Sequence, residues 1–229
     1  MPTSTPPRSL LDRAGFPMIR LDPPGGFIHW LPVTKIQFEA FLCDRPPASF
    51  APPWYEALLT LNPRVAPHRV QASNYWGAFV TGIKPEEAAA FAAWCGADFG
   101  LPTREEWFSV YRLARATAAV PAAAIARTGR TPRARSLIER LETATTALQP
   151  RDRPRTLADQ MLLRRGVMEW VECSERQRRW GAFGQPHVRF HGNLYDLESG
   201  RPSFPTDLDQ RRLHSHGFRL IQRGNGIIS

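Results

Sequence analysis

The sequence is poor in cysteine and has no long apolar run. Its 229 residues include only Cys43, Cys95 and Cys173, which are too few and too scattered for a disulfide framework or a zinc ribbon. We expect these thiols to be small buried hydrophobes or unreactive groups. Because no run of about 18 apolar residues occurs, we expect no transmembrane span. The N-terminal stretch also lacks a continuous apolar core, so we expect no secretory signal and a cytoplasmic protein.

Lysine is almost absent. Only Lys35 and Lys84 occur, so nearly all of the positive charge behind the net charge of +9 is arginine. A base composition that favours Arg, Ala and Pro codons would explain this, and so would a polyanionic partner or an acidic protein surface. The arginines are spread along the chain rather than set on one helix face, which favours the first explanation.

Apolar residues are plentiful and unevenly distributed. The hydrophobic fraction of 42%, with 7 Trp and 13 Phe, is sufficient for a packed core, and 22 Pro with 16 Gly predict a loop-rich fold of short elements. Residues 1–15 are predicted to be a flexible, proline-bearing arm, and residues 16–229 a single domain. An Arg-rich insertion is predicted within that domain at about residues 118–157.

Two adjacent helices are the strongest local prediction. Pro85, followed by glutamates, indicates a helix start near Lys84, and Gly96 or Gly100 can end that helix. Thr103 and Glu106 form a capping box that begins a second helix. We expect Trp94 and Trp107 to face inward from the two helices, which then require a further layer to cover them.

Shorter elements are predicted on both sides of this pair. Phe16 to Leu21 and Phe27 to Leu31 have the pattern of two strands joined by a turn. Thr34 and Gln37 form a capping box before a helix from Lys35 to Leu42. Residues 188–190 and 218–221 are predicted strands, and the long polar segment between them, His191 to His216, is where we expect binding.

Four motifs occur in a fixed order along the chain. They are Gly26-Phe27-Ile28-His29-Trp30-Leu31-Pro32-Val33-Thr34; Val80-Thr81-Gly82-Ile83 with Trp94; Leu101-Pro102-Thr103-Arg104-Glu105-Glu106-Trp107; and Gly166-Val167-Met168-Glu169-Trp170 followed by Gly217-Phe218-Arg219. This set resembles the formylglycine-generating enzyme (sulfatase-modifying factor) superfamily, whose patterns include LPTEAEWE, GNVWEW and a terminal GFR.

The resemblance implies an α+β fold related to C-type lectins, with two short helices on a twisted antiparallel sheet and much irregular chain. It implies structural roles for the motif residues, which are Thr34, Trp94, Thr103, Glu106, Trp107, Glu169, Trp170 and Arg219. Catalytic members hold copper with two cysteines shortly before the GFR strand, and thiolates suit that soft ion. Residues 205–219 contain no cysteine here. We therefore expect no catalytic residue and no cofactor.

Calcium is a second point of departure. Family members often bind structural calcium through the asparagine of GNVWEW, because this hard ion prefers oxygen ligands. Arg165-Gly166 stands at that place in this chain, and an arginine would repel a cation. The family's calcium site is therefore expected to be lost.

Candidate binding residues fall in two regions. In the family the segment that precedes GFR lines the binding groove, and the corresponding ligand candidates are Asn193, Tyr195, Asp196, Arg211, Arg212, His214 and His216. The insertion supplies candidates for docking a protein partner, namely Arg127, Arg130, Arg133 and Arg135. Four histidines could in principle hold a transition metal, although ordinary polar loop and strand roles are favoured for His187, His191, His214 and His216.

The expected function is therefore a non-catalytic recognition module that binds a protein or peptide, as a subunit of a multi-protein bacterial system. One alternative is a divergent metal-dependent oxidase. Others are a nucleic-acid-associated component, or a ligand-binding protein diversified by a retroelement. Membrane association is not expected.

Overall fold

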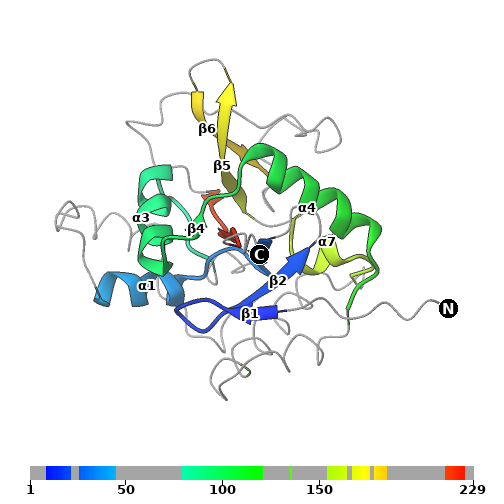
Figure 1. Cartoon of the computed structure of the whole chain (residues 1–229), viewed down its shortest axis with the longest axis horizontal. Helices are drawn as coiled ribbons and strands as arrows, with labels where there is room; N and C mark the ends of the chain where they lie inside the picture. Colours follow the sequence, from blue (N-terminus) through cyan, green and yellow to red (C-terminus); the bar gives the residue numbers. More distant parts are fainter. Residues whose placement is uncertain are drawn as a thin grey trace, which may run out of the picture.

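The computed structural model describes residues 9–21, 26–44, 79–120, 135, 154–163, 167–175, 178–184 and 215–224. This part of the chain is mixed α and β (Figure 1). Its helices are α1 (Lys35–Asp44), α3 (Pro85–Cys95), α4 (Arg104–Ala116) and α7 (Leu157–Gln160). Its strands are β1 (Ser9–Leu11), β2 (Pro17–Leu21), β3 (Gly26–His29), β4 (Phe99–Gly100), β5 (Met168–Glu175), β6 (Arg178–Phe183), β7 (His216–Gly217) and β8 (Ile221–Gln222).

The strands form two sheets. The larger has the order β1-β2-β3-β8-β4, and every neighbouring pair in it is antiparallel. The smaller has the order β6-β5-β7, in which β5 pairs antiparallel with β6 and parallel with β7. The α+β class is therefore as predicted, with one parallel pair among otherwise antiparallel strands.

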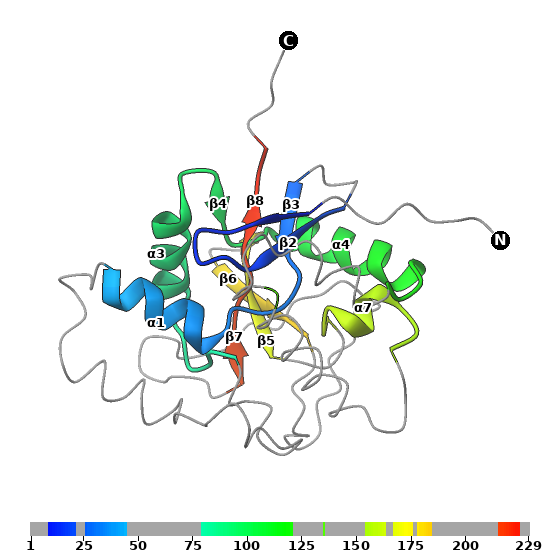
Figure 2. The same cartoon turned by 90° about the horizontal axis from the view of Figure 1, so that it is seen from below.

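Strand β5 separates two hydrophobic cores. Val171 belongs to a core with Trp107 of α4 and Leu157 of α7, whereas its neighbour Trp170 belongs to a core with Phe91 of α3. Successive strand residues point to opposite faces, so one strand contributes to both cores. Figure 2 shows the same division, with α1 and α3 on one side of the molecule and α4 and α7 on the other.

Local capping signals place the helix starts where the sequence predicts them. The Thr34 amide donates to Gln37 Oε1 at 2.8 Å, and α1 begins at the next residue. The Thr103 amide donates to Glu106 Oε2 at 2.7 Å, while the Glu106 amide donates to Thr103 Oγ1 at 3.2 Å. Both capping boxes are confirmed, because each orphan amide finds its acceptor within three residues.

The N-terminal prediction is wrong between residues 9 and 15. Strand β1 lies inside the predicted flexible arm and pairs with β2, with Ser9 opposite Ile19. A tight turn follows, in which the Gly15 amide donates to the Asp12 carbonyl at 3.0 Å. Asp12 is itself buried. The folded domain therefore begins before residue 16, because pairing with β2 and burial of Asp12 hold this segment in place.

Trp94 is only partly as predicted, because it packs against the core with Phe91 but is not fully buried. Trp107 is fully buried, but Trp94 is half-buried at the rim of α3. Its Nε1 donates to Asp44 Oδ2 at 2.8 Å, and the Arg13 guanidinium lies 4.9 Å from its ring centre. Polar partners from two other segments keep this ring at the surface, since an indole can bury one side and hydrogen-bond at the other.

The two ends of the Arg-rich insertion lie side by side. Ala118 pairs antiparallel with Thr156, and the Ala119 amide donates to the Arg155 carbonyl at 3.1 Å. The side chain of Gln160 bonds both backbone groups of Val120, accepting from its amide at 2.7 Å and donating to its carbonyl. We call residues 117–120 and 154–157 the stem. The chain thus leaves the domain and returns to it at one place.

The C-terminal strand prediction is partly wrong. Residues 218–220, predicted as strand, lie between the short strands β7 and β8. Phe218 and Leu220 are buried in the core beside α1 and α3, and Arg219 points to the opposite side. The alternation that predicted a strand is therefore real, but the backbone bonds of this segment go to separate partners, including Val33 and His29.

None of the helices in the described part of the chain has the length and apolar character that a membrane crossing needs.

Candidate functional site

Residues of the third and fourth sequence motifs meet at a buried ion pair. Arg219 of the Gly-Phe-Arg motif donates from Nε and Nη2 to the two carboxylate oxygens of Glu169, both at 2.6 Å. Trp107 Nε1 also donates to Glu169 Oε2, at 2.7 Å. All three side chains are buried at 0% exposure. The motifs therefore converge because their polar residues satisfy one another inside the protein.

The remaining donors of Arg219 are used by the backbone. Its Nη1 donates to the carbonyls of His29 and Trp30 at 3.0 and 3.3 Å, and its Nη2 also donates to the Met161 carbonyl at 2.8 Å. With two bonds to Glu169, every N–H of the guanidinium has an acceptor. This arrangement ties β3, α7 and β5 together and leaves neither charged group available to a substrate. It is a structural brace.

His216 is the one predicted ligand residue that lies within the described part of the chain. Its ring packs on Trp170 with 4.6 Å between ring centres, and its Nδ1 lies 3.1 Å from Ser215 Oγ. The side chain is buried, and burial lowers the pKa of His216 to about 4. The imidazole is therefore neutral at pH 7, where it can accept or donate a single hydrogen bond through each nitrogen.

Trp170 provides the rigid support beneath that imidazole. Its Nε1 donates to the Ile83 carbonyl at 2.6 Å, which fixes the plane of the indole. Ile83 belongs to the second motif and Trp170 to the fourth, so a contact between two motifs holds the ring on which His216 lies. His216 Nε2 is buried, and no hydrogen-bond partner for it occurs among the residues that the structure describes.

The other predicted binding residues lie outside the described ranges. These are Asn193, Tyr195, Asp196, Arg211, Arg212 and His214, together with the metal candidates His187 and His191 and the docking candidates Arg127, Arg130 and Arg133. Arg135 is described as an exposed helical residue. Within the described ranges, no three His, Cys, Asp or Glu side chains are grouped so that they could hold a metal ion.

A buried acid–histidine pair was not anticipated from the sequence. His29 Nε2 lies 3.0 Å from Asp12 Oδ2, which also accepts from Gln37 Nε2 at 2.9 Å. The Phe16 amide donates to the other oxygen, Asp12 Oδ1, at 2.8 Å. Burial raises the pKa of Asp12, but the hydrogen bond to His29, its charge and the two amide donors outweigh burial and lower the pKa below its ordinary value. Asp12 is therefore ionised.

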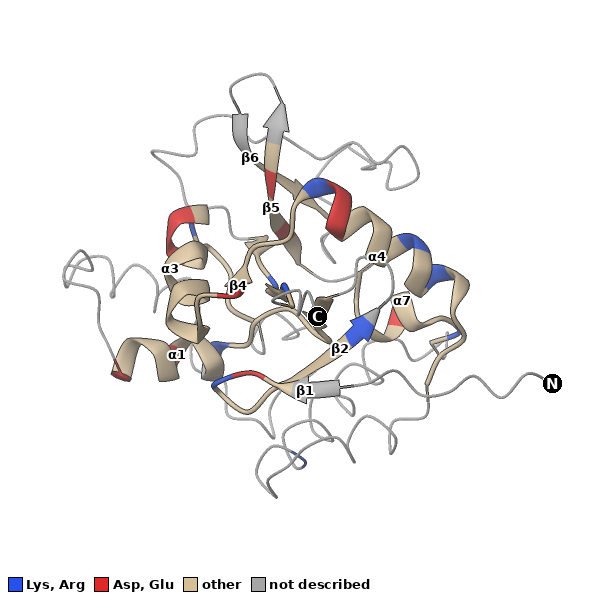
Figure 3. Cartoon of the chain, in the orientation of Figure 1, with Lys and Arg blue, Asp and Glu red and all other residues tan. Residues whose placement is uncertain are grey.

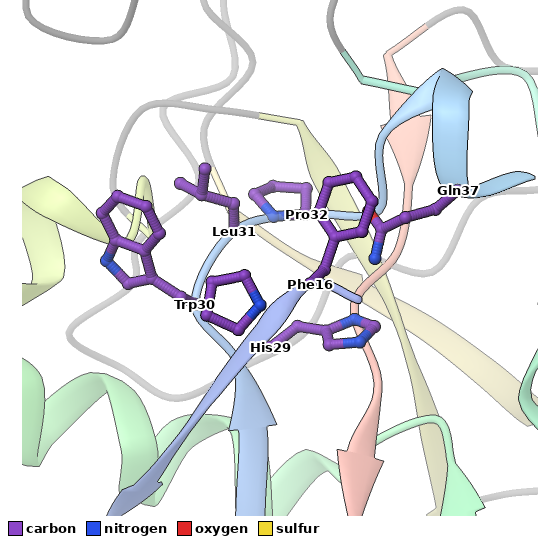
Figure 4. Close-up of a pocket in the computed structure, with 7 residues that line it drawn as sticks. Phe16, His29, Trp30, Leu31, Pro32 and Gln37 are labelled. Carbon is purple, nitrogen blue, oxygen red and sulfur yellow. The ribbon is translucent and has the colours of Figure 1, made fainter. Parts of the chain in front are cut away.

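This pair is unsuited to acid–base catalysis. His29 Nδ1 accepts from the Leu220 amide at 3.4 Å, and His29 Nε2 lies 3.0 Å from Asp12 Oδ2, so both ring nitrogens are engaged within the fold. Neither ring nitrogen is left for a substrate proton. A small cavity lies beside the pair, lined by Phe16, Pro17, His29, Trp30, Leu31, Pro32 and Gln37. In Figure 4 the Trp30 ring extends away from His29 and Gln37, whose side chains instead share Asp12 Oδ2 as a partner.

One local signal in the sequence predicts the turn that places Asp12, although it does not predict the partners of Asp12. Asp12 and Gly15 occupy the first and last positions of a four-residue turn, where these residue types are favoured. That signal predicts the hairpin of β1 and β2. It does not identify His29 or Gln37 as partners, since those contacts depend on the order of strands in the sheet.

The thiols are unreactive at two of the three positions. Burial, followed by the charge of Asp12, raises the pKa of Cys95 far above its ordinary value. Burial likewise raises the pKa of Cys173. Thiolate is the nucleophilic form, so both are poor nucleophiles at neutral pH. Cys43 is exposed, so it is not one of the buried thiols.

Comparison of the sequence with protein-family models and with curated proteins gives no match.

Proposed function

We propose that this chain is a non-catalytic recognition module with a formylglycine-generating-enzyme-like, C-type-lectin-related fold, and that it binds a protein or peptide partner. The observation that carries the proposal is the buried network of Trp107, Glu169 and Arg219. It joins the motifs on which the family resemblance rests, and it accounts for their polar residues by internal hydrogen bonds. Those residues then support a binding surface instead of taking part in a reaction.

The chemistry of the remaining groups also favours binding over catalysis. Residues 205–219 lack the cysteine pair that copper would require. The Asp12–His29 pair has both imidazole nitrogens engaged. The thiols of Cys95 and Cys173 have raised pKa values. An active site would need at least one polar group held ready for a substrate, and these groups are committed to the fold.

The surface proposed for binding is the segment from Asn193 to His216, which returns to the domain at the rigid Trp170–His216 contact. Tyr195 supplies an amphipathic ring, and Asn193 and Asp196 supply hydrogen-bonding groups, as in many recognition loops. We further propose a cytoplasmic, multi-protein bacterial setting. The ligand is expected to be polypeptide.

Site-specific photo-crosslinking tests this proposal. A photoreactive phenylalanine analogue would replace Tyr195 in one variant, and Ala93 on the exposed side of α3 in a matched control. We expect one protein to be crosslinked in host lysate at position 195 and not at position 93. Replacement of Asn193, Tyr195 and Asp196 by alanine should then abolish its capture. Equal crosslinking at both positions, or capture that survives the triple replacement, would refute this binding surface.

The oxidase alternative requires a different observation. Stoichiometric copper or iron retained after purification, together with oxygen consumption in the presence of a thiol substrate, would establish an enzyme. The candidate metal ligands predicted from the sequence are His187, His191, His214 and His216. Of these, His216 is the one whose position the structure describes, and it is buried. If it is a ligand, His216→Phe should remove the metal.

A further inference from the structure

Strand β1 forms one edge of the larger sheet. It pairs with β2 on one side, and no other strand pairs with it in the described part of the chain (Figure 1). Leu11, which is half-exposed, lies opposite Pro17. Pro17 has no N–H, and its carbonyl accepts from the Trp30 amide on the other side of β2, so these two opposite residues share no backbone bond.

The hydrogen bonds of the next residue show which backbone groups of β1 point away from the sheet. The Asp12 amide donates to the Phe16 carbonyl at 2.8 Å, so it points toward β2. Successive residues of an extended chain turn their amide and carbonyl groups to opposite sides, so those of Leu11 point outward and those of Leu10 point toward β2. By the same alternation, the amide and carbonyl of Ser9 point outward.

The two edges of this sheet differ in whether their outward groups are used. At the β4 edge, the Phe99 amide donates to the Gly96 carbonyl at 3.2 Å. The Leu101 carbonyl, just after β4, accepts from Arg223 Nη2 at 2.9 Å. At the β1 edge, none of the described residues bonds the outward amides or carbonyls. The chain therefore closes one edge with its own groups and leaves donors and acceptors at the other.

Charged side chains next to the β1 edge are committed to the fold. Three donors converge on the buried Asp12 carboxylate, and the Arg13 guanidinium pairs with Asp44. Along β2, Figure 3 shows basic colour at the end of the strand and no acidic colour. Recognition at this edge therefore depends on backbone hydrogen bonds, which supply the affinity when a strand is added to a sheet.

An extended polypeptide is the partner whose groups match this edge. Ser9 and Leu11 each offer one donor and one acceptor, at positions two residues apart. Alternate residues of an extended chain present their N–H and C=O groups to one side with the same spacing, so an added strand can bond all four groups. A helix uses its backbone groups within itself and offers no such row.

We infer that β1 binds an extended segment of a polypeptide partner by strand addition, which gives the five-stranded sheet a further strand. This inference rests on the proposed recognition of a polypeptide. It adds a second contact surface, separate from the segment from Asn193 to His216, at which the main chain of the partner is bound.

A selected peptide tests the inference. A phage-displayed library of random peptides would be selected on the full-length protein, and the binding of a selected peptide would be measured by fluorescence anisotropy. The variant is Ser9→Pro, which removes one outward N–H and is tolerated on an edge strand, and the control is Ser9→Ala, which keeps that N–H. Protection of the Leu10 amide from hydrogen exchange would establish that β1 still pairs with β2 in each protein.

A second measurement leaves the protein unchanged. Each amide of the selected peptide would be N-methylated in turn, which removes one donor at a time. In an added strand only alternate amides face β1, so we expect methylation to weaken binding at every second residue along the bound part of the peptide.

We expect Ser9→Pro to weaken peptide binding about tenfold through loss of one hydrogen bond, and Ser9→Ala to leave it unchanged. Failure to select any peptide, binding that Ser9→Pro does not weaken, or methylation effects without a two-residue period would overturn the inference. A dimer of the protein that Ser9→Pro dissociates would overturn it in favour of a second copy at this edge. Crosslinking at position 195 reports on the other surface, so loss of strand addition with that crosslink retained would overturn this inference alone.

Discussion

Arg219 and Glu169, fifty residues apart in the chain, form a two-pronged ion pair with no exposure to solvent. A buried pair of this kind is costly to break from one side, because the remaining charge has lost both water and its partner. Arg219 is also the donor to the carbonyls of His29, Trp30 and Met161, which would lose these hydrogen bonds without it.

We predict that Arg219→Met lowers the free energy of unfolding by about 3–5 kcal/mol. The double variant Arg219→Met/Glu169→Leu should lose less than the sum of the two single changes, since it leaves no lone buried charge. Urea denaturation measures both. Arg13→Met is the matched control, because the Arg13–Asp44 pair is about half-exposed, at 50% and 47%, and should contribute at most about 1 kcal/mol. Similar small losses for the buried and exposed pairs would contradict the bracing role.

Glu106 gives the fold a dependence on acid pH. Burial raises its pKa, but the hydrogen bonds from Arg223 and from the Thr103 amide, with the charge of Arg223, outweigh this and lower the pKa. A lowered carboxyl pKa adds stability at pH values above the unfolded pKa of about 4.5, and that stability is lost as the pH falls through the folded pKa. We therefore predict that Glu106→Gln flattens the fall of stability below about pH 4.5. Urea midpoints measured from pH 7 to pH 3 would show it, and parallel profiles for both proteins would refute it.

How much of the fold is predictable depends on how far apart along the sequence the two partners of each contact lie. The capping boxes at Thr34 and Thr103 were predicted because donor and acceptor lie three residues apart. The roles of Glu169 and Arg219 came only from a family resemblance, since nothing local indicates that they are partners. The partial exposure of Trp94 was missed for the same reason. Helical periodicity gave its face of α3, but its exposure is decided by Asp44 and Arg13, from other segments.

The contribution of Asp12 to stability tests whether the folded domain begins before residue 16. Three donors converge on its carboxylate, from Phe16, His29 and Gln37, and alanine would leave all three buried without an acceptor. We predict that Asp12→Ala lowers the free energy of unfolding by about 3 kcal/mol. Asp44→Ala, at a carboxylate that is about half-exposed, should cost far less. A neutral effect of Asp12→Ala in urea denaturation would restore the flexible arm predicted from the sequence.

His216 should destabilise the fold as the solution becomes mildly acidic. Burial lowers its pKa from 6.5 to about 4, so the unfolded chain takes up a proton between these values while the folded protein does not. Stability therefore rises with pH across this window, by up to about 3 kcal/mol, and is unaffected above it. We predict that His216→Phe removes this part of the pH dependence and keeps the ring packed on Trp170. Urea denaturation at pH 7.0, 5.5 and 4.5 tests it. An unchanged profile would show that the imidazole does not titrate differently in the two states.

The stem predicts that the insertion can be removed without loss of the fold. Residues 120 and 154 lie at the open end of an antiparallel pair, and the bonds between Gln160 and Val120 hold that end closed. Replacement of residues 121–153 by a four-residue Gly-Ser turn should therefore leave the near-ultraviolet circular dichroism and the cooperativity of thermal unfolding intact, because a short turn can join paired segments.

In that shortened chain, Gln160→Ala should lower the free energy of unfolding by about 1 kcal/mol, through loss of two hydrogen bonds to the stem. Loss of cooperative unfolding on deletion alone would mean that residues 121–153 are part of the core.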